Sequence, residues 1–140
     1  MKKITLFISL LAVSMFIRAQ KAEKMWETPA DLTVSESVLV GDNVLYVSCI
    51  NGKPDQQGSL GFIAQLTPDG KIVKLKWAEG LNAPKGMGIW KNTLYVTDVH
   101  QVVLINLADG KINAKIPVPG SKFLNDIAVD KNGTVAVSDM

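Results

Sequence analysis

The feature that most constrains this chain is a hairpin pattern that recurs along it. Residues 38–50, 88–99 and 127–140 each read as an apolar strand, a polar turn and a second apolar strand containing Ser or Thr near its end. Between them, 63–77 and 104–118 read as a second kind of hairpin, with Asp-Gly turns 40 residues apart. Asp-Gly suits a tight hairpin turn because glycine accepts a positive φ. The chain therefore repeats a β-meander.

The repeat unit is four strands in about 40–50 residues, which is typical of β-propeller blades. We predict an all-β fold with two complete blades, 31–80 and 81–120, and an inner half-blade at 121–140. No window of 11 or more residues has convincing helical periodicity. A β-sandwich is the alternative, but it does not require the same hairpins to recur in register.

A propeller removes its exposed sheet edges by closing a ring of blades. Two and a half blades cannot close one, so we expect the chain to be the N-terminal portion of a longer protein or a truncated product. We also expect residues 21–140 alone to be neither a stable monomer nor an active enzyme, because the terminal blades would leave apolar faces in water.

The first 20 residues have the layout of a secretory signal peptide. A basic start precedes an apolar run at 4–17, and the small residue Ala19 offers a cleavage position. A permanent N-terminal anchor is the alternative. We therefore expect a periplasmic or secreted protein with no membrane attachment after cleavage.

Charge and cysteine content exclude other classes. Residues 1–20 contain three of the 15 basic residues and no acid, so 12 Lys and Arg face 13 Asp and Glu in the remainder, a balance of −1. With no basic stripe, the sequence gives no reason to expect nucleic-acid binding. The single Cys49 cannot form an internal disulfide, and its apolar surroundings predict a small core residue rather than a catalytic thiol.

Aligning the three inner strands on their apolar centres places Glu36, Gly86 and Asn125 at equivalent positions, each at the entry to its strand. In a propeller these positions form a ring around the central channel. A carboxylate and amide oxygens with space between them suit a hard divalent cation such as Ca²⁺. The alternative is that Glu36 is an ordinary exposed residue and that Asn125 caps a turn.

Other polar residues near the strand ends have simpler interpretations. Asp98 and Asp139 recur at the same place in two repeats, which favours a hydrogen-bond acceptor that builds the blade. Lys85 lies near the ring entry and is a candidate for contact with an anion, whereas His100 is expected at the surface or channel rim. The tryptophans within strands, Trp77 and Trp90, are expected to pack between blades.

The segments 35–50 and 123–140 resemble the senescence marker protein/gluconolactonase/luciferin-regenerating enzyme family, the regucalcin-like proteins. The resemblance implies a six-bladed propeller that uses calcium or zinc, in many members to hydrolyse lactones. It implies a metal-ligand role for Glu36 and a metal or substrate role for Asn125, with Asp126 beside the substrate. A small lactone or sugar acid would then be the ligand, and a general base would come from a blade outside this chain.

The chain departs from the family pattern at three places. The family's Pro after the Glu is absent, with Ser37 and Val38 instead, Phe123 stands where the family has a substrate-binding Arg, and Ile127 stands where it has Gly. The strand endings at 94–98 and 134–139 also fit the broader NHL and YVTN-type propellers. We therefore expect a protein that resembles metal-dependent lactone hydrolases, and the alternative is a non-catalytic propeller that binds a protein or glycan partner.

Overall fold

The computed structural model describes residues 21–140, which form ten β-strands and no helix. The predicted signal peptide at 1–20 lies outside the described residues. Residues 21–140 contain no helix with the length and apolar character needed to cross a membrane. The prediction of an all-β fold is confirmed.

The strands follow one another as antiparallel neighbours in three sheets. The first sheet contains β1 (Ser35–Gly41), β2 (Val44–Cys49), β3 (Gly61–Leu66) and β4 (Ile72–Leu81). The second contains β5 (Pro84–Trp90), β6 (Thr93–Asp98), β7 (Gln101–Asn106) and β8 (Ile112–Pro117). The third is a hairpin of β9 (Leu124–Val129) and β10 (Val135–Asp139). All five hairpins expected from the repeat are present.

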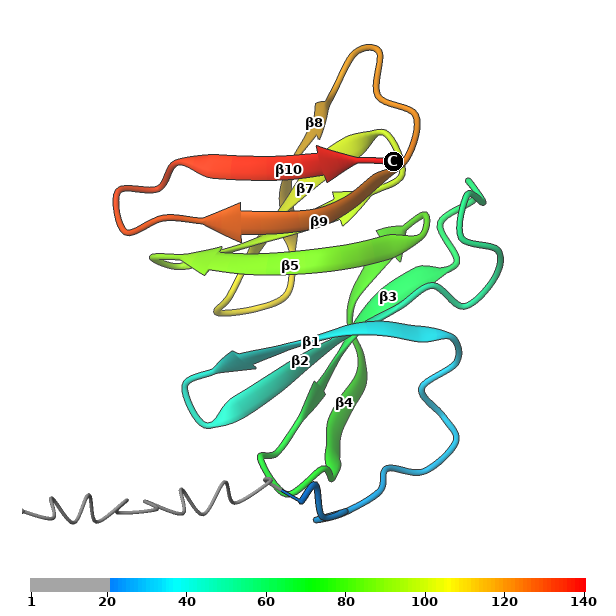
Figure 1. The fold of residues 1–140 in the computed structure, drawn as a ribbon, viewed down its shortest axis with the longest axis vertical. Coiled ribbons are helices and arrows are strands. Elements are labelled where there is room, and N and C mark those ends of the chain that lie inside the picture. Colours follow the sequence, from blue (N-terminus) through cyan, green and yellow to red (C-terminus); the bar gives the residue numbers. More distant parts are fainter. Residues whose placement is uncertain (1–20) are drawn as a thin grey trace, which may run out of the picture.

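The first strand of each sheet lies beside the first strand of the next. Strand β5 contacts β1 on one side and β9 on the other, and Figure 1 shows the three running in the same direction. They belong to different sheets and share no ladder. Side-chain packing holds them together, and the backbone N–H of Leu124 in β9 also donates a hydrogen bond to the Val99 carbonyl after β6 (2.8 Å). Within residues 21–140 the sheets do not close into a ring.

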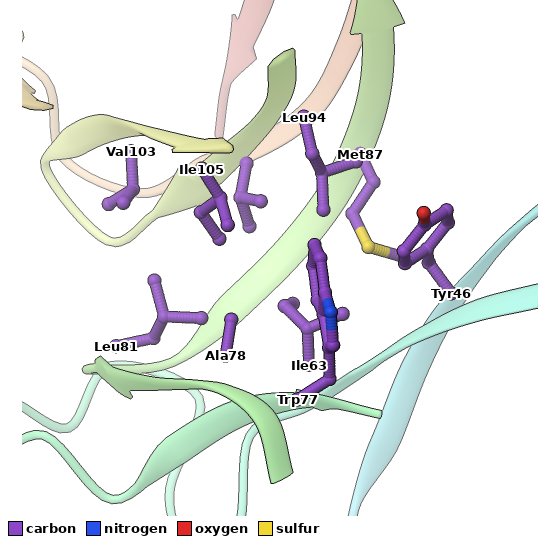
Figure 2. Close-up of a cluster of buried hydrophobic side chains, with 10 residues drawn as sticks. Tyr46, Ile63, Trp77, Ala78, Leu81, Met87, Leu94, Val103 and Ile105 are labelled. Atoms are coloured by element: carbon purple, nitrogen blue, oxygen red, sulfur yellow. The ribbon is translucent and has the colours of Figure 1, made fainter. Parts of the chain in front are cut away.

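The main hydrophobic core lies between the first two sheets (Figure 2). At its centre the rings of Tyr46 and Trp77 are 5.1 Å apart and inclined by 54°, a favourable tilted arrangement. Trp90 packs at the next boundary, because a Cβ added at Gly133 in the β9–β10 turn would lie 2.6 Å from its indole ring. The prediction that Trp77 and Trp90 pack between sheets is confirmed.

A second core cluster covers the opposite face of the first sheet and includes Cys49. The thiol is fully buried, which confirms the prediction of a small core residue. Burial raises the pKa of Cys49 to about 11, because a thiolate is poorly solvated there. At neutral pH the side chain is therefore a neutral, apolar group.

Asp98 joins the end of β6 to the segment that enters β5. Its buried carboxylate accepts hydrogen bonds from the backbone N–H groups of Asn82 (2.9 Å) and Ala83 (2.7 Å), and from the Gln101 amide (2.8 Å). Asp139 repeats the arrangement at the end of β10, where it accepts from the backbone N–H groups that precede β9. The predicted role of Asp98 and Asp139 as structural acceptors is confirmed.

We expect Asp98→Ala to lower the free energy of unfolding by about 3 kcal/mol, because it leaves buried N–H groups without acceptors. Asp139→Ala is the matched control, since water can replace its exposed carboxylate. Urea denaturation monitored by tryptophan fluorescence measures both. An Asp98→Ala effect no larger than that of Asp139→Ala would contradict the importance of burial.

We expect the Cys49 thiol to resist a disulfide reagent at about pH 8 in the folded protein and to react rapidly once unfolded. The reason is its burial together with its raised pKa. Absorbance of the released thiol measures the two rates. Equal rates with and without denaturant would contradict the buried position.

Candidate functional site

The candidate site lies where β1, β5 and β9 begin, at one end of the three adjacent strands (Figure 1). The polar loop 50–60 between β2 and β3 reaches the same end. Gly58 donates a backbone hydrogen bond to the side chain of Asn82, just before β5 (3.2 Å). The sequence predicted no role for this loop, and the structure places it beside the candidate residues.

Strand pairing corrects the alignment of the ring positions. The residues Ser35, Pro84 and Leu124 pair with the ends of the neighbouring strands, and in each hairpin regular pairing resumes three residues later. The residues that follow them are therefore equivalent: Glu36, Lys85 and Asn125. The prediction that Gly86 shares this position was wrong by one residue, because the hairpin pairing aligns residues 87–89, and not 88–90, with residues 38–40.

Gly86 instead shares the next position with Ser37 and Asp126. Ser48 and Ser138 each accept a hydrogen bond at 3.0 Å from the backbone N–H of Ser37 and Asp126, respectively. The equivalent hydroxyl of the middle repeat, Thr97, lies 3.3 Å from the Gly86 carbonyl. The Ser or Thr one residue before the end of each second strand therefore contacts the bulge of the first strand.

Position 86 requires glycine because β9 approaches this part of β5 closely. A Cβ at this position would lie 2.8 Å from the Asn125 carbonyl oxygen and 2.8 Å from the Asp126 Cα. Thr97 crosses the same boundary and donates a hydrogen bond to the Asn125 carbonyl at 2.5 Å. Gly86 is thus a packing residue between β5 and β9 and not a vacant ring position.

Lys85 fills the ring position between Glu36 and Asn125 with a cation. Its residue is only 1% exposed, and its ammonium donates hydrogen bonds to the carbonyls of Pro54 (2.9 Å) and Ala83 (3.0 Å). The ammonium also lies 4.2 Å from the centre of the Phe123 ring, a cation–π contact. This geometry supports a role for Lys85 in fastening loop 50–60, and its contact with an anion stays a prediction.

Burial lowers the pKa of Lys85 from its ordinary value, because the ammonium loses water. The negative charges of Asp98, Glu36 and Asp55 oppose this shift. Glu36 therefore acts on Lys85 electrostatically although it is itself exposed. The shared end contains an acid, a base and an amide instead of a set of oxygen ligands.

The described residues do not fit a divalent-cation site. Glu36 and Asn125 offer one carboxylate and one amide, whereas Ca²⁺ takes about six to eight oxygens. The positively charged ammonium of Lys85, which occupies the position between them, repels a metal cation. Within residues 21–140, no group of three or more His, Cys, Asp or Glu side chains is placed to hold a metal ion.

The other predicted residues occupy different surroundings. Asn125 is partly exposed, and Asp126 is exposed beside it. His100 is exposed, with its Nδ1 3.1 Å from the Ser121 carbonyl, as expected for a rim residue. The sequence interpretation missed Thr97 and Phe123 as parts of the site, although the recurring Ser or Thr before Asp98 and Asp139 was a usable signal.

Comparisons with known proteins give no family for this chain. No family model matches it, and no curated protein does. Among solved structures, a crystal structure of the computationally designed Ika4 protein is similar at a TM-score of 0.37 and 10% identity, over 86% of this chain and 99% of that one. A likeness of this size carries no argument about fold or function.

Replacing Lys85 by Met should change how stability depends on pH. A lysine whose folded pKa is lowered loses its proton more readily when folded, so the wild type should gain stability relative to Lys85→Met as pH rises toward 10.5. Urea titrations of both proteins at several pH values between about 7 and 10.5 measure the difference. A difference that is constant across this range would contradict the buried ammonium. Lys91→Met, at an exposed lysine, is the control.

Proposed function

We propose that this chain forms blades of a β-propeller whose strand-entry end binds a partner without catalysis, and that the protein is exported. The buried Lys85 carries the proposal. Lys85 occupies the position at which a metal-dependent propeller would need a ligand or an open space. Its ammonium donates its hydrogen bonds to backbone carbonyls of the protein itself.

The propeller interpretation is supported by the meander order within each sheet and by the adjacent first strands. Exposed polar groups surround the strand-entry end, including Glu36, Asp126 and Lys122. A surface of both charges with amides nearby suits a polar partner, such as a protein or a glycan. A fold alone assigns no chemistry, so the proposal depends on these residues.

A second candidate is the lactonase-like hydrolase, which is favoured by the equivalence of Glu36 and Asn125 in the strand register. It requires further oxygen ligands and a base from outside the described residues. In that case a Ca²⁺ or Zn²⁺ ion would polarise the lactone carbonyl, and Glu36 would help to hold it.

A glycan array and a lactone-hydrolysis assay with added Ca²⁺ or Zn²⁺ separate the two candidates. For the binding function we expect retention of a glycan or protein ligand, no hydrolysis, and at least about tenfold weaker binding in Glu36→Lys, since a charge reversal at a contact costs over 1.4 kcal/mol. Asp42→Lys makes the same change at the other end of β1 and should leave binding intact. Metal-dependent turnover that Glu36→Lys abolishes would instead establish the hydrolase.

A further inference from the structure

The segment before β1 repeats the packing of the end of β4. Trp77 of β4 packs against Gly110 in the β7–β8 turn, and Trp26 packs against Gly70 in the corresponding β3–β4 turn. Both turn glycines have positive φ, 75° and 82°. Trp26 therefore packs on the first sheet in the same way as Trp77 packs on the second.

A second residue of the segment follows the same relation. Leu81 lies three residues before Pro84 and is buried between the first two sheets. Leu32 lies three residues before Ser35 and packs on the outer face of the first sheet. Residues 22–32 thus hold the positions of an outermost strand, yet 21–29 form no strand in the structure.

The face beneath this segment is equivalent to a face that a whole sheet covers elsewhere. In the second sheet, the cross-strand pairs Leu94–Ile105 and Val96–Val103 are covered by the first sheet. The equivalent pairs of the first sheet are Leu45–Leu66 and Val47–Ala64. Figure 2 shows Tyr46, Ile63 and Trp77 supplying the cover for the second sheet.

The cover on the first sheet is incomplete along β1. Val38 and Val40 are 63% and 75% exposed, whereas Met87, the equivalent of Val38, is 7% exposed beneath the first sheet. A cavity of about 130 Å³ remains between the segment and the sheet, lined by Trp26, Leu32, Val38 and their neighbours. The segment before β1 thus covers only the part of this face that an outermost strand would cover.

We propose that the face of Val38, Val40, Leu45, Val47 and Leu66 docks three further antiparallel strands of the same repeat, and that residues 22–28 pair with them as the fourth. The partner is a sheet with an open third-strand edge and bulky apolar residues at the positions of Tyr46 and Ile63. This interface concerns the outer face of the first sheet and does not depend on what the strand-entry end binds.

The test places a second copy of residues 84–111, which contain β5–β7 and the following turn, directly before Lys21 in place of residues 1–20. The copied Lys111 then precedes Trp26 by six positions, as Lys71 precedes Trp77. We expect the amides of 22–28 to exchange at least about tenfold more slowly than in the chain beginning at Lys21, because they become strand donors. The melting temperature should rise by about 5 °C or more.

Val40→Lys provides the specificity control. Val40 is exposed in the unmodified chain, so the substitution should leave its melting temperature unchanged but abolish the slower exchange in the grafted chain. Val73→Lys, at another exposed valine of the first sheet, should leave both unchanged. A second graft places a copy of residues 35–71, which contain β1–β3 and the following turn, before Lys21 in the same way. It provides an independent test if the first graft folds poorly.

Unchanged exchange at residues 22–28 in both grafts would overturn the proposal. So would slower exchange that survives Val40→Lys. Sedimentation of the chain beginning at Lys21 measures whether two copies associate through this face. A dimer whose 22–28 amides are already protected would show that a second copy occupies the face, and would overturn the assignment to three further strands.

Discussion

The packing of the first sheet against the second is the interaction on which the rest of the structure depends. Tyr46, Ile63 and Trp77 on one side meet Leu94, Val96 and their neighbours on the other, with most of this surface removed from water. Burial of this kind is the main stabilising term in a small β-domain. Because the sheets stack through these faces, their first strands lie side by side and bring Glu36, Lys85 and Asn125 to one end.

Two polar devices fix the position of each first strand within this arrangement. A carboxylate at the end of the second strand holds the incoming backbone, through Asp98 in one repeat and Asp139 in another. A hydroxyl one residue earlier, in Ser48, Thr97 or Ser138, contacts the backbone of the bulge. The first repeat has Cys49 instead of the aspartate, and there Thr33 and Val34 pair by backbone bonds with residues 50 and 51. The repeats thus share a geometry although one of them lacks the carboxylate.

The chemical character of the strand-entry end follows from one residue. With Gly86 at the ring position, the end would present an acid, a gap and an amide, which favours a cation. With Lys85 there, a positive charge lies between the oxygens and fastens loop 50–60 through Pro54. The cost of burying the ammonium is offset by two carbonyls, the Phe123 ring and nearby acids. The pairing of β5 with β6 therefore decides which residue faces this end, and with it which class of ligand is compatible.

The sequence alone determined the strands, their hairpin order, the buried state of Cys49 and the packing of Trp77 and Trp90 between sheets. Alternation of apolar residues and Asp-Gly turns are local properties, and they recur often enough to identify the repeat. It also identified Asp98 and Asp139 as structural acceptors, because a residue repeated at a strand end serves the repeat. Only the structure decided that Lys85 and not Gly86 stands beside Glu36 and Asn125, since the strand pairing makes residues 87–89 equivalent to 38–40, whereas the apolar pattern alone also allows 88–90. It alone placed Trp26 on Gly70, because a contact between residues 44 positions apart depends on how the segment before β1 lies against the first sheet.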